Sequence, residues 1–253
     1  MKRVSKAAER ARMDAILDTL ERTYPDARPG LHFTNAFELL ISTILSAQCT
    51  DKRVNEVTKP LFRDYPDAKS MAQMTQQELA EYIHSCGFYT TKSKNILATC
   101  RILVEQYDGQ VPADLELLQQ LPGVGRKTAN VVCSNAFGMD CIAVDTHVFR
   151  VSNRLGLAHA KDVHKTEEQL MQNIPKEKWS NAHHWLIYHG RQVCSARKPK
   201  CEICTVAPYC ETFNGKTANG STAKPVTKPA KQKKMESELQ KRAKRSSQKV
   251  KEA

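Results

Sequence analysis

Residues 121–130 read LPGVGRKTAN, in which two helical segments meet at a turn containing Gly123 and Gly125. Two glycines permit positive φ and leave backbone N–H groups uncovered, so the turn can form a concave nest at the start of the next helix. The helix dipole adds positive potential at the same point, and neither contribution depends on base sequence. The turn therefore suits a phosphate group, although a helical hairpin that serves packing alone has the same pattern.

Helical periodicity continues on both sides of this turn. Apolar residues recur at spacings of three and four, strand patterns are nearly absent, and Gly and Pro separate the segments, so we expect an all-α protein. One helix begins after Asn35, which can cap it together with Glu38, and its apolar stripe over 37–45 is extended by Gln48. The other expected helices are 54–62, 76–86, 92–107, 115–120, 126–137, 146–155, 163–173 and 179–193.

Basic charge is concentrated at the end of the chain. The 253 residues carry a net charge of +12, and residues 214–253 alone contribute twelve Lys and Arg against three Glu, a net +9. This segment has no aromatic residue and is rich in Lys, Ala, Ser and Thr, a composition that cannot offset the entropy cost of folding. We expect a disordered basic tail that adds salt-sensitive affinity for a polyanion.

Membrane insertion and secretion are not expected. The chain has no run of eighteen apolar residues, and residues 1–13 are basic but lack the apolar segment of a signal peptide, so they predict the start of a helix. Five cysteines lie scattered in apolar helical patterns, as in a protein of the reducing cytosol. These five are Cys49, Cys86, Cys100, Cys133 and Cys141.

The other four cysteines form one run with metal-ligand spacing. Four thiolates within seventeen residues can close around one metal centre, and zinc, an iron–sulfur cluster or disulfides are the possible outcomes. Zinc ribbons usually pair two Cys-x2-Cys knuckles, whereas this run has one, so spacing alone leaves the metal open. Within the run, Arg197, Lys198 and Lys200 would face a negatively charged partner. The run is Cys194-x6-Cys201-x2-Cys204-x5-Cys210.

Together these motifs resemble the endonuclease III branch of the helix-hairpin-helix DNA glycosylases. The hairpin LPGVGRKTAN, the VDTH segment at 144–147 and the four-cysteine run occur in family order over roughly seven-tenths of the chain. The resemblance also includes SAQCTD at 46–51, GFY at 87–89 and HHW at 183–185.

The resemblance implies two helical domains with DNA lying between them. A six-helix barrel-like domain with the helix-hairpin-helix would span residues 29–139, and a second domain would join residues 1–28 with 140–213. The second domain would carry a [4Fe-4S] cluster whose role is mostly structural, because it would fix the basic loop against phosphates. Its implied ligands are Cys194, Cys201, Cys204 and Cys210.

Two residues are implied in catalysis. Lys127 follows the glycine turn by two positions, where the helix dipole and neighbouring cations favour the uncharged, nucleophilic amine, although a phosphate contact is the simpler interpretation of a lysine there. The family's lysine attacks C1′ of a damaged nucleotide, forms a Schiff base and cuts the strand on the 3′ side by β-elimination. Asp145 is typical of an N-cap, and by resemblance it also stabilises positive charge on the sugar. His147 would support them.

The remaining implied residues bind DNA. A base inside a duplex must be flipped out before C1′ is reached, and Gln48 matches the family position that fills the gap. Phe88 stands where family members often place Leu as a wedge, so the opposite-base preference cannot be carried over. Phosphates would be bound by Gly123, Gly125 and Arg126 and by the basic loop of Arg197, Lys198 and Lys200.

The function expected from this resemblance is a bifunctional DNA glycosylase and lyase of base excision repair. Its partner would be double-stranded DNA with oxidised pyrimidines or abasic sites, and we expect a monomer in the cytoplasm, associated with the nucleoid if the source is bacterial. An adenine-mismatch glycosylase of the same superfamily is disfavoured because it lacks the lysine and needs an acidic residue early on, where residues 39–50 have none. A non-enzymatic helix-hairpin-helix module would not need Lys127 and Asp145 together.

Overall fold

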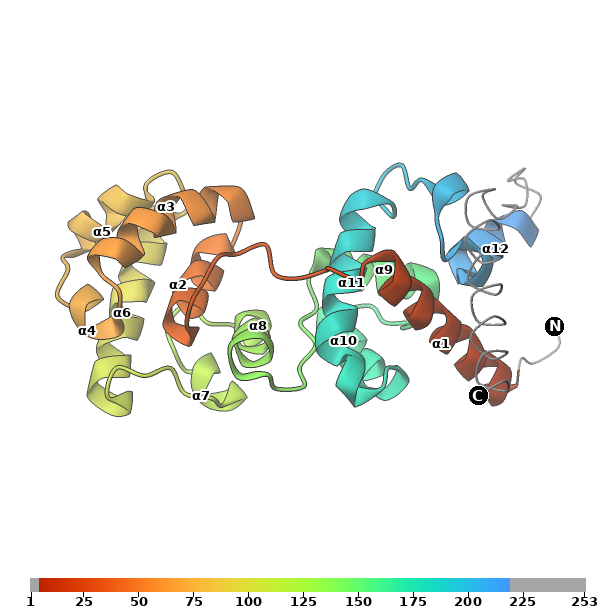
Figure 1. Ribbon diagram of the computed structural model, residues 1–253, viewed down its shortest axis with the longest axis horizontal. Helices are drawn as coiled ribbons and strands as arrows, with labels where there is room; N and C mark the ends of the chain where they lie inside the picture. The colour runs from red at the N-terminus through yellow and green to blue at the C-terminus, as the bar shows by residue number, and fades with distance from the viewer. Residues whose placement is uncertain (1–4, 219–253) are drawn as a thin grey trace, which may run out of the picture.

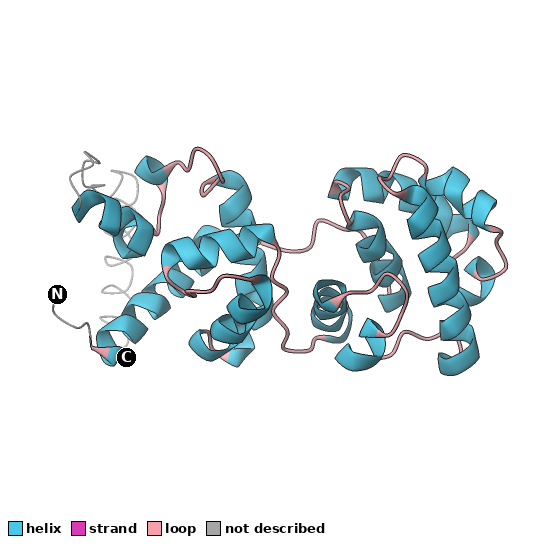
Figure 2. Ribbon diagram, turned by 180° about the vertical axis from the view of Figure 1, so that it is seen from behind, coloured by secondary structure: helices cyan, strands magenta, loops and turns pink. Residues whose placement is uncertain are grey.

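The structure is a computed structural model that describes residues 5–218, and all regular elements in that range are helices, as the sequence predicted (Figure 1, Figure 2). No described helix combines the length and the hydropathy needed to cross a bilayer. Beyond residue 218, the expected disordered tail lies outside the described residues. The helices are α1 (Lys6–Thr23), α2 (Ala36–Ser46), α3 (Asp51–Asp64), α4 (Ala68–Met71), α5 (Gln76–Ile83), α6 (Tyr89–Tyr107), α7 (Leu115–Gln119), α8 (Arg126–Phe137), α9 (Thr146–Leu155), α10 (Val163–Asn173), α11 (Trp179–Gln192) and α12 (Glu211–Ala218), with 3₁₀ turns η1 (Lys176–Lys178), η2 (Cys201–Ile203) and η3 (Ala207–Tyr209).

The helices gather into two lobes that lie side by side, and the chain crosses between them before α2 and after α8 (Figure 1). Each lobe has its own cluster of buried apolar side chains. The first cluster draws on residues 37–133, and the second draws on residues 13–24 together with 142–210. The exact domain boundaries at 28/29 and 139/140 stay predictions.

Helix α2 lies at the centre of the first core. Asn35 caps it as predicted, because its side chain accepts the Glu38 N–H at 2.9 Å. Residues 39–45 are all buried, so the helix is enclosed on every side instead of showing a single apolar stripe. The helix ends at Ser46, so Gln48 lies in the following turn with φ +53° and does not extend the helix.

Two helices begin earlier than the apolar pattern indicated. Helix α3 begins at Asp51 because the Thr50 hydroxyl caps the N–H of Arg53 at 3.3 Å. Helix α6 begins at Tyr89, directly after Phe88, whose φ of +58° and ψ of +31° are left-handed. The first residues of both helices are polar or exposed, so they add nothing to the apolar periodicity from which the helices were predicted.

Helix α8 connects the two lobes. It packs in the first core through Ala129, Val132 and Cys133, while its other face bonds to helices of the second lobe. The Ser134 hydroxyl donates to the Ser180 hydroxyl at 2.7 Å, and Asn135 Oδ1 lies 3.0 Å from His184 Nε2. Helix α8 is therefore held at a fixed place between the lobes.

Candidate functional site

The glycine turn is anchored to the first lobe through helix α6. Gly123 has φ +80°, and a Cβ there would lie 3.0 Å from the Asn95 side chain. The Thr99 hydroxyl donates to the Pro122 carbonyl at 3.0 Å, and the Val124 N–H donates to Leu121 O at 3.0 Å. These contacts fix the turn, so its exposed N–H groups need not be ordered when a phosphate arrives.

The two glycines of the turn should respond differently to alanine. Gly123→Ala is expected to lower the free energy of unfolding by about 1 to 2 kcal/mol, because the residue is left-handed and Asn95 crowds its Cβ. Gly125 has φ −86°, and a Cβ added there would have nothing within 4 Å, so Gly125→Ala should change stability by less than about 1 kcal/mol.

Measurements of DNA binding should distinguish the roles of Gly123 and Gly125 further. Both alanine variants should weaken binding to duplex DNA, because a methyl group hinders the approach of a phosphate to the backbone N–H groups. Urea unfolding and fluorescence anisotropy at fixed salt measure the two effects. A Gly125→Ala protein with unchanged DNA affinity would contradict a phosphate contact at Gly125.

Lys127 is the second residue of α8, and its side chain is exposed. Its Nζ forms no hydrogen bond or ion pair with any residue between 5 and 218. The neighbouring Arg126 differs, because its guanidinium makes a bidentate contact to Glu167 of α10, with the shortest N–O distance 2.8 Å. In this structure Arg126 therefore ties α8 to the second lobe, whereas the Lys127 amine has no hydrogen-bond or ion-pair partner among the described residues.

Asp145 ends the second crossing between the lobes and caps α9. One oxygen, Oδ1, accepts the N–H groups of His147 and Val148, both at 2.8 Å. The other oxygen, Oδ2, accepts no hydrogen bond from the part of the chain that the structure describes. Capping thus occupies one oxygen and leaves the second for a ligand, so the capping and catalytic interpretations of Asp145 are compatible.

A buried histidine is influenced electrostatically by both of these side chains. His183 of α11 has its Nδ1 2.6 Å from the Ala143 carbonyl, and since a carbonyl only accepts, Nδ1 carries the proton. Burial lowers the pKa of His183 to about 3, with a further lowering from His184 and, last, from Lys127, while Asp145 acts in the opposite direction. The charges of Lys127 and Asp145 therefore both act on the His183 imidazole.

His147 lies within the second lobe and contacts residues of α9 and α11 there. Its Nδ1 lies 3.2 Å from Arg150 Nη2, which also donates to the Gly190 carbonyl at 3.0 Å. A Cβ at Gly190 would lie 3.1 Å from the His147 side chain, so α9 and α11 approach each other closely here. These contacts give His147 a part in packing α9 against α11, and its predicted DNA contact stays a prediction.

Gln48 and Phe88, the predicted plug and wedge, lie at neighbouring turns. Both have left-handed backbones, at φ +53° and +58°, and they are two of the three non-glycine residues with positive φ in the described range. Such conformations cost of order 1 kcal/mol or more and persist where surrounding contacts impose them, often at functional sites. The Phe88 side chain is 65% exposed, which is unusual for a large apolar ring and suits insertion into a base stack.

The four cysteines of the C-terminal run line one cavity. Cys194 and Cys210 are buried, and Cys201 and Cys204 are half-buried. Burial, with smaller contributions from the Cys210, Cys194 and Cys201 groups, raises the pKa of the Cys204 thiol to about 12, so the four thiols are close enough to repel each other as thiolates. A cationic metal centre removes that repulsion, so this donor set fits a metal cluster.

Within residues 5–218, no three His, Cys, Asp or Glu side chains lie close enough together to hold one metal ion. Mononuclear zinc needs four sulfur atoms about 2.3 Å from one point.

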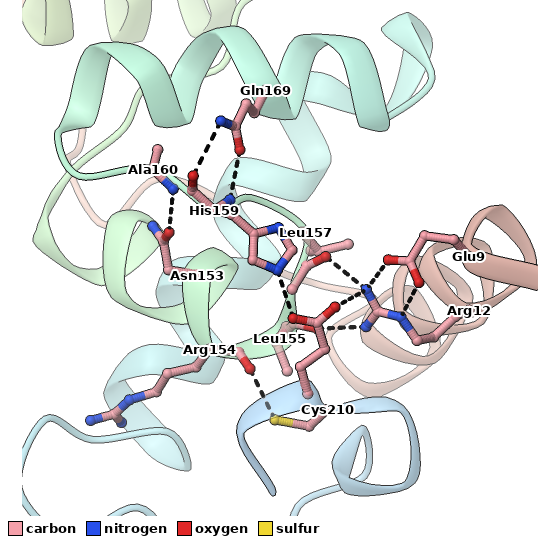
Figure 3. Close-up of polar contacts among 12 residues, drawn as sticks. Glu9, Arg12, Asn153, Arg154, Leu155, Leu157, His159, Ala160, Gln169 and Cys210 are labelled. Atoms are coloured by element: carbon pink, nitrogen blue, oxygen red, sulfur yellow. Dashed lines mark hydrogen bonds and ion pairs between the residues drawn. The ribbon is translucent and has the colours of Figure 1, made fainter. Parts of the chain in front are cut away.

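Two arginines hold the cysteine loop through hydrogen bonds to its backbone carbonyls. Arg154 donates to the Ser195 carbonyl at 2.7 Å and to the Ala196 carbonyl at 2.8 Å. Its own carbonyl accepts from Cys210 Sγ at 3.3 Å (Figure 3). Arg12 of α1 donates to the Leu155 and Tyr209 carbonyls at 2.6 and 2.9 Å. The N-terminal helix and the loop are thereby fastened to the same end of α9.

The basic side chains of this loop are free to meet DNA. Arg197, Lys198 and Lys200 are all exposed, and no ion pair to a described residue involves them. The loop backbone is nevertheless fixed, because Ser195 Oγ donates to the Lys198 carbonyl at 2.6 Å and the Lys200 N–H donates to Val193 O at 3.0 Å. A rigid loop with three such cations suits the phosphate backbone.

Replacing one cysteine should show what the loop contributes to DNA binding, separately from the chemical step. Cys201→Ser is expected to lose iron and the broad visible absorption, and the slope of log affinity against log salt should become shallower by up to about 3, one unit for each cation that leaves a phosphate. Cys141→Ser, outside the run, is the matched control and should keep its iron. A Cys201→Ser protein with full iron content would remove Cys201 from the ligand set.

Two residues in this region were not identified from the sequence as functional. His183 stood out in the sequence only as part of the HHW segment, and Lys92 was not singled out. Lys92 is on the apolar face of α6, four residues before Ile96 and eleven before Leu103, and a lysine on such a face is the signal that could have identified it.

Comparisons with known families give two matches along the chain. Residues 41–176 match the family described as HhH-GPD superfamily base excision DNA repair protein. Residues 194–210 match the iron-sulfur binding domain of endonuclease III, which contains all four cysteines of the run. The first match covers the hairpin, Lys127 and Asp145.

Individual proteins are similar over most of their length. Endonuclease III of Synechocystis sp. is 50% identical over 205 residues, which are 81% of this chain and 94% of the relative. Endonuclease III of Escherichia coli is 47% identical over 196 residues, 78% of this chain and 93% of the relative. A solved structure of a trapped endonuclease III–DNA covalent intermediate is 45% identical with a TM-score of 0.78, covering 82% of this chain and 98% of that one.

Proposed function

The chain belongs to the HhH-GPD superfamily and, within it, to the endonuclease III family of base excision repair glycosylase/lyases with a [4Fe-4S] cluster, and from this premise we propose that it acts on oxidised pyrimidines and abasic sites through Lys127. The observation that supports Lys127 most directly is its exposed Nζ, which has no hydrogen bond or ion pair to a described residue. Asp145, with one unoccupied oxygen, acts with it.

The reaction begins with extrusion of the damaged nucleotide from the duplex. Gln48 fills the space that the nucleotide leaves, and Phe88 enters the stack beside it. The N–H groups around Gly123 and Gly125, and the cations Arg197, Lys198 and Lys200 across the second lobe, hold the phosphates of the bent strand. The iron–sulfur cluster, held by the four cysteines, fixes the shape of the loop that carries these cations.

Nζ of Lys127 then attacks C1′, the C1′–N bond breaks, and its electron pair leaves with the base, which takes up the proton that Nζ loses. The carboxylate of Asp145 stabilises the positive charge that develops at C1′. Ring opening gives a Schiff base between Nζ and C1′. Loss of a proton from C2′ then expels the 3′ phosphate, which cuts the strand on the 3′ side, and water hydrolyses the Schiff base to free the amine.

Borohydride trapping tests this proposal. The protein is incubated with duplexes that carry thymine glycol, an abasic site, or adenine opposite 8-oxoguanine, and borohydride is added to reduce the Schiff base. A covalent complex is expected with thymine glycol and with the abasic site. Base release from the adenine mismatch without a covalent complex would favour the mismatch glycosylase instead.

We also propose that the protein acts as a monomer and works in the cytoplasm, at the nucleoid if its source is bacterial. The similar proteins from Synechocystis sp. and Escherichia coli are bacterial endonuclease III enzymes, and the net charge of +12 favours association with DNA.

A further inference from the structure

Helix α6 carries a lysine in an unusual environment. Lys92 is 5% exposed, and it is the one lysine among the buried residues of the described range. Burial lowers its pKa, so retaining an amine here is costly unless the amine has partners. The reaction described above does not use this residue.

The hydrogen-bond partners of Lys92 are backbone carbonyls at the C-terminal end of helix α2. Its Nζ donates to the Leu45 carbonyl at 2.8 Å and to the Ala47 carbonyl at 2.7 Å. Carbonyls at a helix C-terminus have no N–H donor within the helix, and a lysine amine can donate the missing hydrogen bonds. A side chain from α6 therefore caps α2 immediately before Gln48.

The backbone of Lys92 is attached to the second turn. Its N–H donates to the Phe88 carbonyl at 3.0 Å, as part of the first turn of α6. A Cβ on Gly87 would lie 3.3 Å from the Gln48 carbonyl, and the thiols of Cys49 and Cys86, one from each turn, are close enough for Cys49 to raise the pKa of Cys86. The turn that carries Gln48 and the turn that carries Phe88 are thus in contact, and Lys92 bonds to both.

We propose that Lys92 is a positioning residue that holds the Gln48 and Phe88 turns in their left-handed conformations at a fixed separation, so that plug and wedge enter the duplex together. The inference rests on the proposed function, because it takes Gln48 and Phe88 to be the inserting residues. Lys92 itself does not touch DNA. Its loss should affect nucleotide extrusion more than general DNA binding, because the phosphate contacts lie elsewhere.

Lys92→Met removes both hydrogen bonds while nearly preserving side-chain length, and Lys92→Arg keeps donors for the two carbonyls. With Lys92→Met, the single-turnover rate on a thymine glycol duplex at saturating protein should fall roughly 10- to 100-fold, the range expected when reacting groups are misplaced by about 1 Å. Affinity for undamaged duplex should stay within about 2-fold, because it comes from phosphate contacts. Lys92→Arg should recover most of the rate.

A second measurement follows insertion without chemistry. The fluorescence of 2-aminopurine placed opposite a tetrahydrofuran abasic analogue should rise when wild type binds, and the rise should be lost with Lys92→Met. Lys59→Met, an exposed lysine on α3 in the same lobe, is the matched control and should behave as wild type. If Lys92→Met does not give folded protein, Lys92→Leu, which likewise has no hydrogen-bond donor, takes its place.

Two results would overturn the proposal. One is an unchanged rate and fluorescence response in Lys92→Met. The other is an equal loss of undamaged-duplex affinity and of rate in both the Met and Arg variants, which indicates a packing role alone. Failure of the proposed function looks different, since wild type would then neither trap nor cut DNA, whereas the fluorescence measurement needs only bound duplex.

Discussion

Lys127→Ala should abolish borohydride trapping on both thymine glycol and abasic duplexes, with a loss of at least roughly 10³-fold in the single-turnover rate. The reason is that the amine supplies the atom that bonds to C1′, and no water or neighbouring side chain replaces a Schiff base. The side chain makes no bond to a described residue, so the fold should be unaffected. Unfolding in urea and the trapped fraction on a denaturing gel measure the two consequences.

Lys127→Arg is the matched control for charge. It keeps a cation beside the glycine turn but cannot form the Schiff base, because a guanidinium is not deprotonated in proteins. It should bind duplex DNA about as tightly as wild type and fail to trap. Trapping that survives in both variants would mean that another amine is the nucleophile.

The second large effect is expected at Asp145, where capping and catalysis can be separated. Asparagine caps helices about as well as aspartate, so Asp145→Asn should keep the bonds to the His147 and Val148 N–H groups and lose only the negative charge. Base release should fall by roughly 10²- to 10⁴-fold, the usual worth of a positioned acid–base or charge-stabilising group. The free energy of unfolding should fall by no more than about 1 kcal/mol, from the lost interaction with the helix dipole.

Asp145→Ala removes the cap as well and completes the comparison. Its catalytic loss should match that of Asp145→Asn, while its free energy of unfolding should fall by about 1 kcal/mol more. In a chain of this size that difference moves the melting temperature by about 2 to 4 °C. Equal stability of the two variants would show that the cap contributes little, and near-normal activity in the asparagine variant would assign Asp145 to capping alone.

Local signals in the sequence predicted much of the fold. The helix over 163–173 has the predicted bounds, and Asn35 and Asp145 cap α2 and α9 as their residue types indicated. A cap or an apolar period involves residues three or four apart, so the sequence displays it directly. The prediction was wrong at Gln48, which lies past the end of α2, because a left-handed turn has no periodic signature.

The sequence predicted the candidate site only in part. Lys127, Asp145 and the four cysteines came from motifs, and their functional roles stay proposals. Arg126 was expected to face DNA, and its guanidinium contacts Glu167, a residue 41 positions away. Nothing within one helix indicates such a partner, since it depends on how α8 and α10 pack.

By itself, the amino-acid order determined most of the helices, the glycine turn and the cysteine run, because each of these depends on residues that are neighbours along the chain, whereas the short helices α4 and α12 were not predicted. Only the tertiary structure decided which groups are free and which are occupied. Packing brings Lys92 to the Gln48 and Phe88 turns, although its two acceptors lie 45 and 47 residues earlier in the sequence. Packing also lets the charges of Lys127 and Asp145 act on the His183 ring. These long-range contacts form only when separate helices share a core, and no local pattern records them.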